Sequence, residues 1–135
     1  MKKQFILLTS LFLFLGLHVI NAQATQQECT IKYNLFKGDY QSKKYDDAFP
    51  NWIYLMDNCP TLSINIYKLG DKLTEVRFKK ATNKTEALVL IKRVYKQRLE
   101  YFPSKDPAKV HSDYATFLVK NKLATDDEVF EILEL

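Results

Sequence analysis

KYDDAFPNWIYLMDNCP, residues 44–60, is the stretch that decides the fold class. Its apolar side chains recur at spacings of three and four residues, which is the period of an amphipathic helix. These side chains are Tyr45, Ala48, Phe49, Trp52, Leu55 and Met56. Asp46 and Asp47 place negative charge in the first turn, where the helix dipole favours it. Pro60 ends the pattern because proline cannot continue the hydrogen-bond ladder, and Pro50 is expected to kink the helix.

The same periodicity continues along the rest of the chain and predicts five more helices. They are expected over 29–42, over 62–80, from a cap at Thr82 or Thr85 to Phe102, from Asp106 to about Leu118, and from Thr125 to Leu135. In the first of them, Ile31 and Leu35 are expected on the apolar side, with Phe36 and Tyr40 as further candidates for that side. Thr125 with Glu128 forms a capping box for the last. Because only short turns separate the helices, we expect one all-α domain made of three antiparallel helix pairs.

These helix pairs resemble the tetratricopeptide repeat, whose unit is two antiparallel helices over about 34 residues. If the first unit starts at Cys29, its small, aromatic and terminating positions fall on Ala48, Trp52 and Pro60. A small residue lets the two helices approach closely, and the aromatic ring fills the space beside it. The expected signature packing residues are Leu35, Tyr45, Ala48, Trp52, Leu55, Pro60, Leu69, Gly70, Ala87, Ile91 and Val94. The second unit is stretched before Ala87, and the third is faint.

Beyond the generic repeat, the chain resembles a family of exported tetratricopeptide proteins from Bacteroidetes. The stretches that carry this resemblance are 44–48 with Trp52 and 58–60, 65–67 with Gly70, and 95–98 with 101–102. Members of this family tend to be longer and to carry further repeats. The resemblance therefore implies a right-handed helical-repeat solenoid in the cell envelope, and it implies no particular reaction.

The first residues have the three-part pattern of a secretory signal peptide. Lys2 and Lys3 precede an apolar run over 5–20, and Ala22-Gln23-Ala24 supplies the small residues of a cleavage site. The alternative is a membrane anchor, but the apolar run is short for about 30 Å of hydrocarbon. The segment before Cys29 lacks the small and aliphatic residues that lipid attachment needs, so a lipoprotein is not expected.

We therefore expect a signal peptide over 1–24 and a helical-repeat domain over 25–135, in the periplasm or outside the cell. Removing Lys2 and Lys3 lowers the formal charge from +4 to +2. The remaining basic residues are scattered among acidic ones, which is typical of solvated helix faces. We expect no nucleic-acid partner, and peripheral membrane association only through partner proteins.

Cys29 and Cys59 are the two cysteines of the chain. An even count in an exported protein favours a disulfide. Cys29 starts the first helix of the first pair and Cys59 ends the second, and antiparallel helices bring these two ends together. We therefore expect a disulfide between them. The alternative, a redox-active pair, is not supported because there is no Cys-x-x-Cys motif.

No catalytic motif, cofactor site or metal site is recognisable in the sequence. His111 is the single histidine of 25–135, and it has no cysteine or histidine partner at ligand spacing. The acidic runs 46–47 and 126–128 lie at helix starts, where the helix dipole explains them. We expect no enzyme activity. The alternative is a small envelope domain that binds a small ligand, or acts as an enzyme, through an inter-helix pocket.

The concave surface of such an array is lined mainly by the first helix of each pair, which suggests where a partner binds. The candidate binding face is Tyr33, Asn34, Lys37, Tyr40, Asn65, Tyr67 and Lys68. The expected function is a scaffold that holds another envelope protein or an extended peptide. The apolar C-terminal end, 129–135, is expected to meet further repeats or a second copy of the chain.

Overall fold

The computed structural model describes residues 26–134, and the secondary structure of this range is entirely helical. The six helices span residues 26–41, α2 (Tyr45–Asn58), α3 (Asn65–Lys80), α4 (Lys84–Tyr101), α5 (Pro107–Lys120) and α6 (Asp126–Leu133). The expected all-α class is therefore confirmed for the described range. The signal peptide expected over 1–24 lies outside the described residues.

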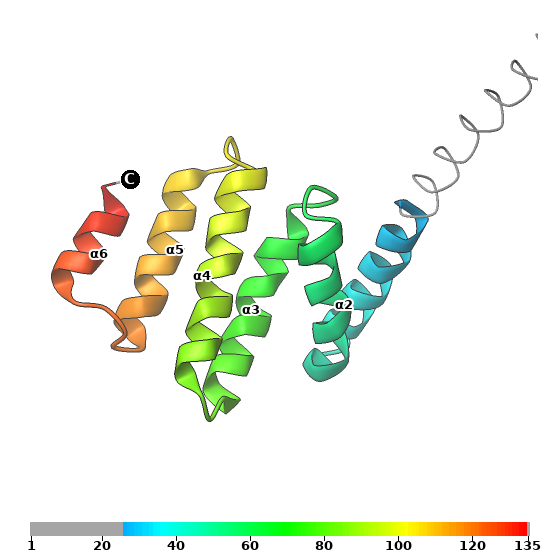
Figure 1. Ribbon diagram of the computed structural model, residues 1–135, viewed down its shortest axis with the longest axis horizontal. Coiled ribbons are helices and arrows are strands. Elements are labelled where there is room, and N and C mark those ends of the chain that lie inside the picture. The colour runs from blue at the N-terminus through cyan, green and yellow to red at the C-terminus, as the bar shows by residue number, and fades with distance from the viewer. Residues whose placement is uncertain (1–25, 135) are drawn as a thin grey trace, which may run out of the picture.

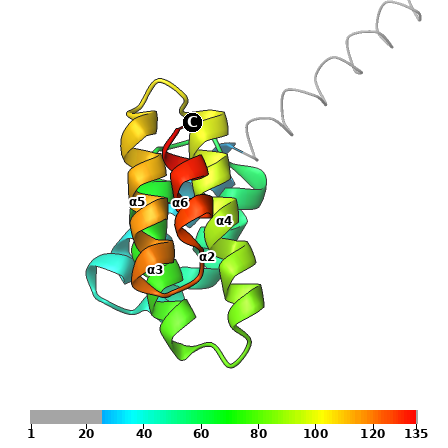
Figure 2. The same cartoon turned by 90° about the vertical axis from the view of Figure 1, so that its left-hand side faces the viewer.

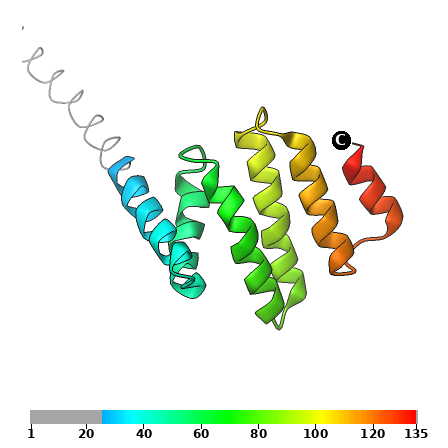
Figure 3. The ribbon, with the colours of Figure 1, turned by 180° about the vertical axis from the view of Figure 1, so that it is seen from behind.

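The helices stand side by side in chain order, and each runs antiparallel to the one before it (Figures 1 and 3). Each of the helices α2 to α6 packs against its neighbour in the sequence. Figure 2 looks along the row from the α6 end and shows α3 and α5 on one side and α4 on the other. Helices 26–41 and α6 therefore form the two ends of the row.

Local signals set several helix ends. Thr125 and Glu128 form the expected capping box at the start of α6, in which each residue bonds the backbone N–H of the other. The expected cap of α4 is wrong, because the Asn83 side chain accepts the backbone N–H groups of Thr85 and Glu86. Asparagine is among the best N-cap residues, so it displaces both neighbouring threonines. Pro50 lies within α2, which continues through it as one helix.

The larger core cluster lies between helix 26–41, α2 and α3 and reaches Val94 of α4. Trp52 is its centre: the ring is wholly buried and Nε1 donates a hydrogen bond to the carbonyl oxygen of Ile66 at 2.7 Å. Gly70 makes this position possible, since a Cβ atom there would lie 2.7 Å from the Trp52 ring. Trp52 of α2 therefore packs directly against the backbone of α3 at Gly70.

The other signature residues divide between buried and half-buried positions. Ala48, Leu55, Ile91 and Val94 are buried, while Tyr45, Pro60, Leu69 and Ala87 are half-buried. The inward position expected for Leu35 is wrong, because its side chain is 50% exposed, as is that of Ile31. Phe36, at 0% exposure, packs in the core instead. The inward stripe of this helix is Cys29, Tyr33, Phe36 and Tyr40, one residue per turn.

Cys29 and Cys59 lie at disulfide distance, with Cα atoms 5.9 Å and sulfur atoms 2.10 Å apart. The expected pairing is confirmed. Because Cys29 must point at the end of α2, the pair also fixes the rotation of helix 26–41 about its axis. Within residues 26–134, no helix combines the length and the apolar character needed to cross a membrane.

The smaller core cluster lies between α3, α4 and α5. Its buried members are Phe78, Ile91, Tyr95 and Val110. Phe78 meets Phe117 of α5 edge-on, with ring centroids 5.4 Å apart. By contrast, α6 contains no buried residue, so the last helix contributes little to either core.

Candidate functional site

Two surfaces of the row have the character of binding sites. The first, which we call the odd-helix face, is formed by the first, third and fifth helices: 26–41, α3 and α5. Its exposed and half-buried side chains are Tyr33, Lys37, Tyr40, Asn65, Lys68, Lys72, Glu75, Asp113, Thr116 and Lys120. Asn65, Lys68, Lys72 and Glu75 follow each other at spacings of three and four, so they form one stripe along α3.

Two members of the predicted binding face, Tyr33 and Asn65, are linked by a hydrogen bond between helix 26–41 and α3. The Tyr33 hydroxyl lies 3.3 Å from Asn65 Nδ2, which donates to it, and 3.3 Å from the Ser63 hydroxyl. Lys37 is exposed one turn after Tyr33, and Lys68 lines the groove between α3 and α5. The part of the odd-helix face nearest the N-terminus is therefore formed by four of the predicted residues: Tyr33, Lys37, Asn65 and Lys68.

The remaining three predicted residues differ in their exposure. Tyr40 is half-buried and packs edge-on against Phe36, with burial raising the pKa of its hydroxyl. Asn34 is exposed. The binding role expected for Tyr67 is wrong: the residue is 0% exposed, its hydroxyl donates to the Pro60 carbonyl at 3.0 Å, and its ring packs on Phe102. Tyr67 therefore belongs to the core rather than to the surface.

A groove of about 310 Å³ runs between α3 and α5 on the odd-helix face. Glu75 is the centre of its ion pairs, with Lys79 Nζ at 2.8 Å, Lys72 Nζ at 3.3 Å and Lys120 Nζ of α5 at 3.8 Å. The hydrogen bonds from Lys79 and Lys72 lower the pKa of the Glu75 carboxyl. The groove therefore carries fixed charges of both signs, with lysine ammonium groups on both of its walls.

Arg98 of α4 lies beneath this groove and is only 3% exposed. Its Nη1 is 3.8 Å from Asp71 and 3.9 Å from Asp113, which is too long for a hydrogen bond. Among the described residues, Arg98 Nε and Asp71 Oδ1 are buried without a hydrogen-bond partner. Burial raises the pKa of Asp71 to about 7, and Arg98 only partly opposes this. The floor of the groove is therefore a poorly compensated charge cluster.

Sequence reasoning missed Arg98, since an arginine in an amphipathic helix is normally assigned to the solvated side. The sequence did contain one signal that Arg98 is buried, which is its position along the helix. Arg98 continues the stripe of Ile91 and Val94 at helical spacing, so the periodicity alone places it inside. A charged residue on an apolar stripe, with two aspartates on neighbouring helices, is a pattern that periodicity can reveal.

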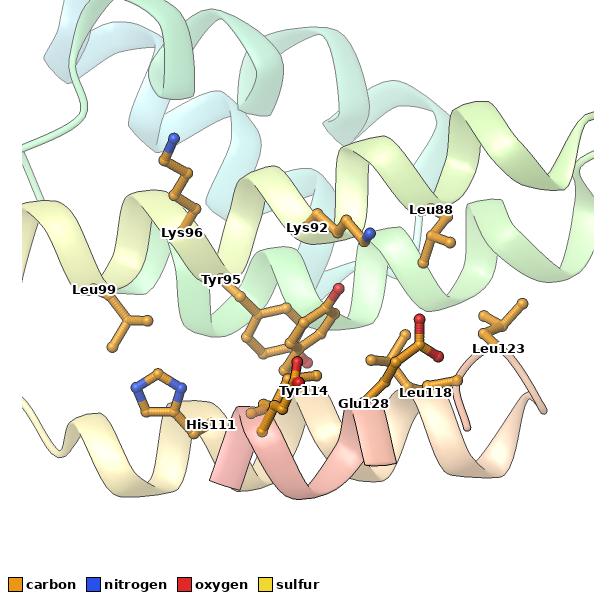
Figure 4. Close-up of a pocket in the computed structure, with 13 residues that line it drawn as sticks. Leu88, Lys92, Tyr95, Lys96, Leu99, His111, Tyr114, Leu118, Leu123 and Glu128 are labelled. Carbon is orange, nitrogen blue, oxygen red and sulfur yellow. The ribbon is translucent and has the colours of Figure 1, made fainter. Parts of the chain in front are cut away.

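The second surface is a cleft between α4, α5 and α6, with a volume of about 480 Å³ (Figure 4). Its apolar wall consists of Leu88, Leu99, Leu118, Leu123 and Ile132, with the rings of Tyr95 and Tyr114. These two rings lie with centroids 4.8 Å apart in the middle of the cleft, and His111 lies toward one end. Lys92 and Lys96 line the α4 side, and Glu128 and Glu131 line the α6 side.

The carboxyl groups of this cleft do not have the environment of acid–base catalysts. Glu128 and Glu131 are exposed, and Glu128 is engaged in the capping box with Thr125. The hydrogen bonds from Thr125 lower the pKa of Glu128, whereas a general acid near neutral pH needs a raised one. Within residues 26–134, no three His, Cys, Asp or Glu side chains gather as metal ligands would.

Comparison of the chain with protein-family models, with curated proteins and with solved structures gave no match. The chemistry of the two surfaces, rather than kinship, therefore has to decide between functions. The odd-helix face offers a charged and polar surface over three helices. The cleft offers an apolar cavity with charged rims.

Proposed function

We propose that this protein is an exported, tetratricopeptide-like scaffold that holds another envelope protein or an extended peptide on its odd-helix face. The observation that carries this proposal is the side-by-side row of antiparallel helices (Figure 2), together with the exposed polar side chains that alternate helices carry. A row of repeated helix pairs gives an extended surface suited to an extended ligand. Catalysis is not part of the proposal.

The charges of the odd-helix face favour an acidic segment as the partner. Lysines lie on all three of its helices: Lys37 on the first, Lys68 and Lys72 on α3, and Lys120 on α5. Of these, Lys72 and Lys120 lie near Glu75, and the buried Arg98 adds positive charge below. Complementary charge mainly increases the association rate and selects the partner. An acidic, extended peptide would therefore cross the lysines of successive helices.

The disulfide supports the proposed location. A pair at bonding distance forms and persists in oxidising compartments such as the bacterial periplasm. This agrees with the export signal expected over 1–24, which lies outside the described residues. The scaffold would act in the cell envelope, where its partner would also be found.

The cleft supports a second candidate, a small-ligand-binding domain. Its volume of about 480 Å³ lies within the usual range for small-molecule sites, and its wall is mostly apolar. However, the charged residues that line it are all exposed to solvent: Lys92, Lys96, Glu128 and Glu131. A ligand there would be held mainly by burial of apolar surface beside Tyr95 and Tyr114.

Matched charge reversals separate the two candidates. Lys37→Glu with Lys68→Glu alters the odd-helix face, and Lys92→Glu with Lys96→Glu makes the same charge change at the cleft. Each tagged variant is used to capture proteins from envelope fractions, and captured proteins are quantified against the unaltered chain. We expect the first pair to lose the partner and the second to retain it. Loss only with the second pair would favour the cleft, and equal capture by both variants would count against the odd-helix face.

A further inference from the structure

The two ends of the row each expose apolar side chains that the fold itself does not cover. At the first end, Ile31 and Leu35 of helix 26–41 are each 50% exposed. At the opposite end, Phe130 and Leu133 of α6 are 62% and 54% exposed. Figures 1 and 3 place these two helices at the extremes of the row. Exposed apolar pairs at both ends are expected where a repeat array meets another element.

Gly38 distinguishes the outer side of helix 26–41 from an ordinary solvated side. It lies within the helix one turn after Leu35, and a Cβ atom there would meet nothing within 4 Å. Glycine inside a helix costs about 1 kcal/mol relative to alanine, and at Gly70 the close approach of Trp52 explains that cost. No contact inside the described chain explains Gly38. The backbone at Gly38 is therefore open to a bulky ring from outside, next to the exposed Leu35.

The charges of the two end helices are complementary. From Asp126 to Glu134, the chain carries five carboxylates and no basic residue. Residues 26–44 carry four lysines against two acids, with Lys43 and Lys44 both exposed at the end of the helix. Two copies of α6 would repel each other, whereas α6 and helix 26–41 attract.

We propose that α6 of one copy of this chain docks on the outer side of helix 26–41 of a second copy, with Phe130 over Gly38 and against Leu35, and Ile31 one turn further along the same side. The two surfaces differ, so the contact is head-to-tail and can repeat along a row of copies. Each added copy continues the stacking of helices that the chain already shows. This contact lies outside the odd-helix face, so it leaves the proposed partner surface open.

The size of α6 sets the strength of this contact. α6 has only eight residues, and it buries none of them in its own chain. A contact made by one short helix falls at the small end of specific interfaces, which is the range of weak and transient association. We expect reversible assembly that grows with protein concentration and weakens when salt screens the charges.

The test uses one variant for each end: Leu35→Glu and Phe130→Glu. The molar mass of the full purified chain is measured by analytical ultracentrifugation over a concentration series. The unaltered chain is expected to grow beyond the dimer as concentration rises, while each variant alone stays monomeric. An equal mixture of the two variants is expected to form a dimer and nothing larger, because Phe130 of one still meets Leu35 of the other.

Three outcomes overturn the proposal: an unaltered chain that is monomeric throughout, variants that assemble as well as the unaltered chain, or a mixture of variants that does not pair. Both substituted residues are exposed, and circular dichroism of each variant checks its folding. If one variant fails to fold, Leu35→Ser or Phe130→Ser replaces it. Lys68→Glu serves as the control for the odd-helix face: it should leave assembly unchanged, and loss of assembly in it alone would move the contact to that face.

Discussion

Helix 26–41, α2 and α3 share a dense core and a disulfide, whereas α5 and α6 meet around a cleft. In the first region, Trp52 is wholly buried, hydrogen-bonded to Ile66 and closed in by Gly70. In the second, α6 buries no residue, and hollows lie on both of its sides. Local stability follows buried apolar contacts. We therefore expect the end formed by helix 26–41, α2 and α3, called the firm end, to be more stable than the end formed by α6, called the loose end. The loose end can respond to a neighbour without cost to the core.

The disulfide should make the largest contribution to this difference. Replacing both Cys29 and Cys59 by serine opens a loop with a sequence separation of 30 residues. The unfolded chain gains freedom, and unfolding should become easier by about 3 kcal/mol. Urea denaturation of the oxidised chain and the double variant measures this change. If reduction of the unaltered chain shifts the midpoint as little as a surface substitution does, the firm end does not depend on the disulfide.

The two helical glycines provide a matched pair for the second prediction. Gly70→Ala should destabilise by about 1–3 kcal/mol, because the new methyl group would overlap Trp52 in a packed core. Gly38→Ala should stabilise by about 0.5–1 kcal/mol, because it meets open space and favours the helix. Thermal melts in dilute solution, where copies stay apart, compare the two. Equal effects would mean that the Trp52–Gly70 contact is not the close one described.

Asp71 lies at the junction of the two regions and should make stability depend on pH. Its pKa in the folded chain is about 7, above its ordinary value of 3.8, because burial disfavours the carboxylate. The folded chain therefore binds this proton more tightly than the unfolded chain. The contribution of Asp71 to the free energy of unfolding is full below about pH 4 and is lost as pH rises through 7.

Asp71→Asn removes the titrating carboxyl group, so the variant provides a reference in which this contribution does not change with pH. Its stability relative to the unaltered chain should rise with pH, by at most about 1.4 kcal/mol per pH unit between pH 4 and 7. Urea titrations at several pH values measure the difference. A difference that is constant with pH would show that Arg98 keeps Asp71 ionised in the folded chain.

The smallest effect is expected at the loose end. Thr125→Ala removes the side chain that accepts the Glu128 N–H, a capping loss of about 1 kcal/mol. Because α6 adds no buried residue, the loss should stay local. Hydrogen exchange should quicken in α6 while exchange in α2 and the urea midpoint stay the same. A matching loss of global stability would show that α6 folds as one unit with the core.

Sequence alone predicted best where the signals were local. The bounds of α2 follow from its acidic first turn and from Pro60, and the capping box of α6 follows from Thr125 and Glu128. The Cys29–Cys59 pair needed only the antiparallel arrangement of two neighbouring helices. These features depend on contacts between residues close in the chain or at the ends of one pair.

Sequence reasoning failed where the burial of a residue depends on the rotation of its helix about the helix axis, or on contacts with residues far along the chain. Leu35 and Phe36 are both apolar, and the structure buries Phe36, on the side of the helix that carries Cys29, while it exposes Leu35. Tyr67 was assigned to the surface, although Phe102, far along the chain, covers it. Arg98 was missed because its partners lie on two other helices. Periodicity along α4 places Arg98 on the apolar stripe, but no local pattern identifies its aspartate partners or the rotation of helix 26–41.

Lysine footprinting of the complex tests the central claim, that the odd-helix face holds the partner. Exposed lysines are acetylated in the free chain and in the chain bound to its captured partner, and the labelled sites are read by mass spectrometry. We expect Lys37, Lys68, Lys72 and Lys120 to be protected, while Lys92 and Lys96 label as they do in the free chain. Protection of Lys92 and Lys96 with full labelling of the other four would contradict the account.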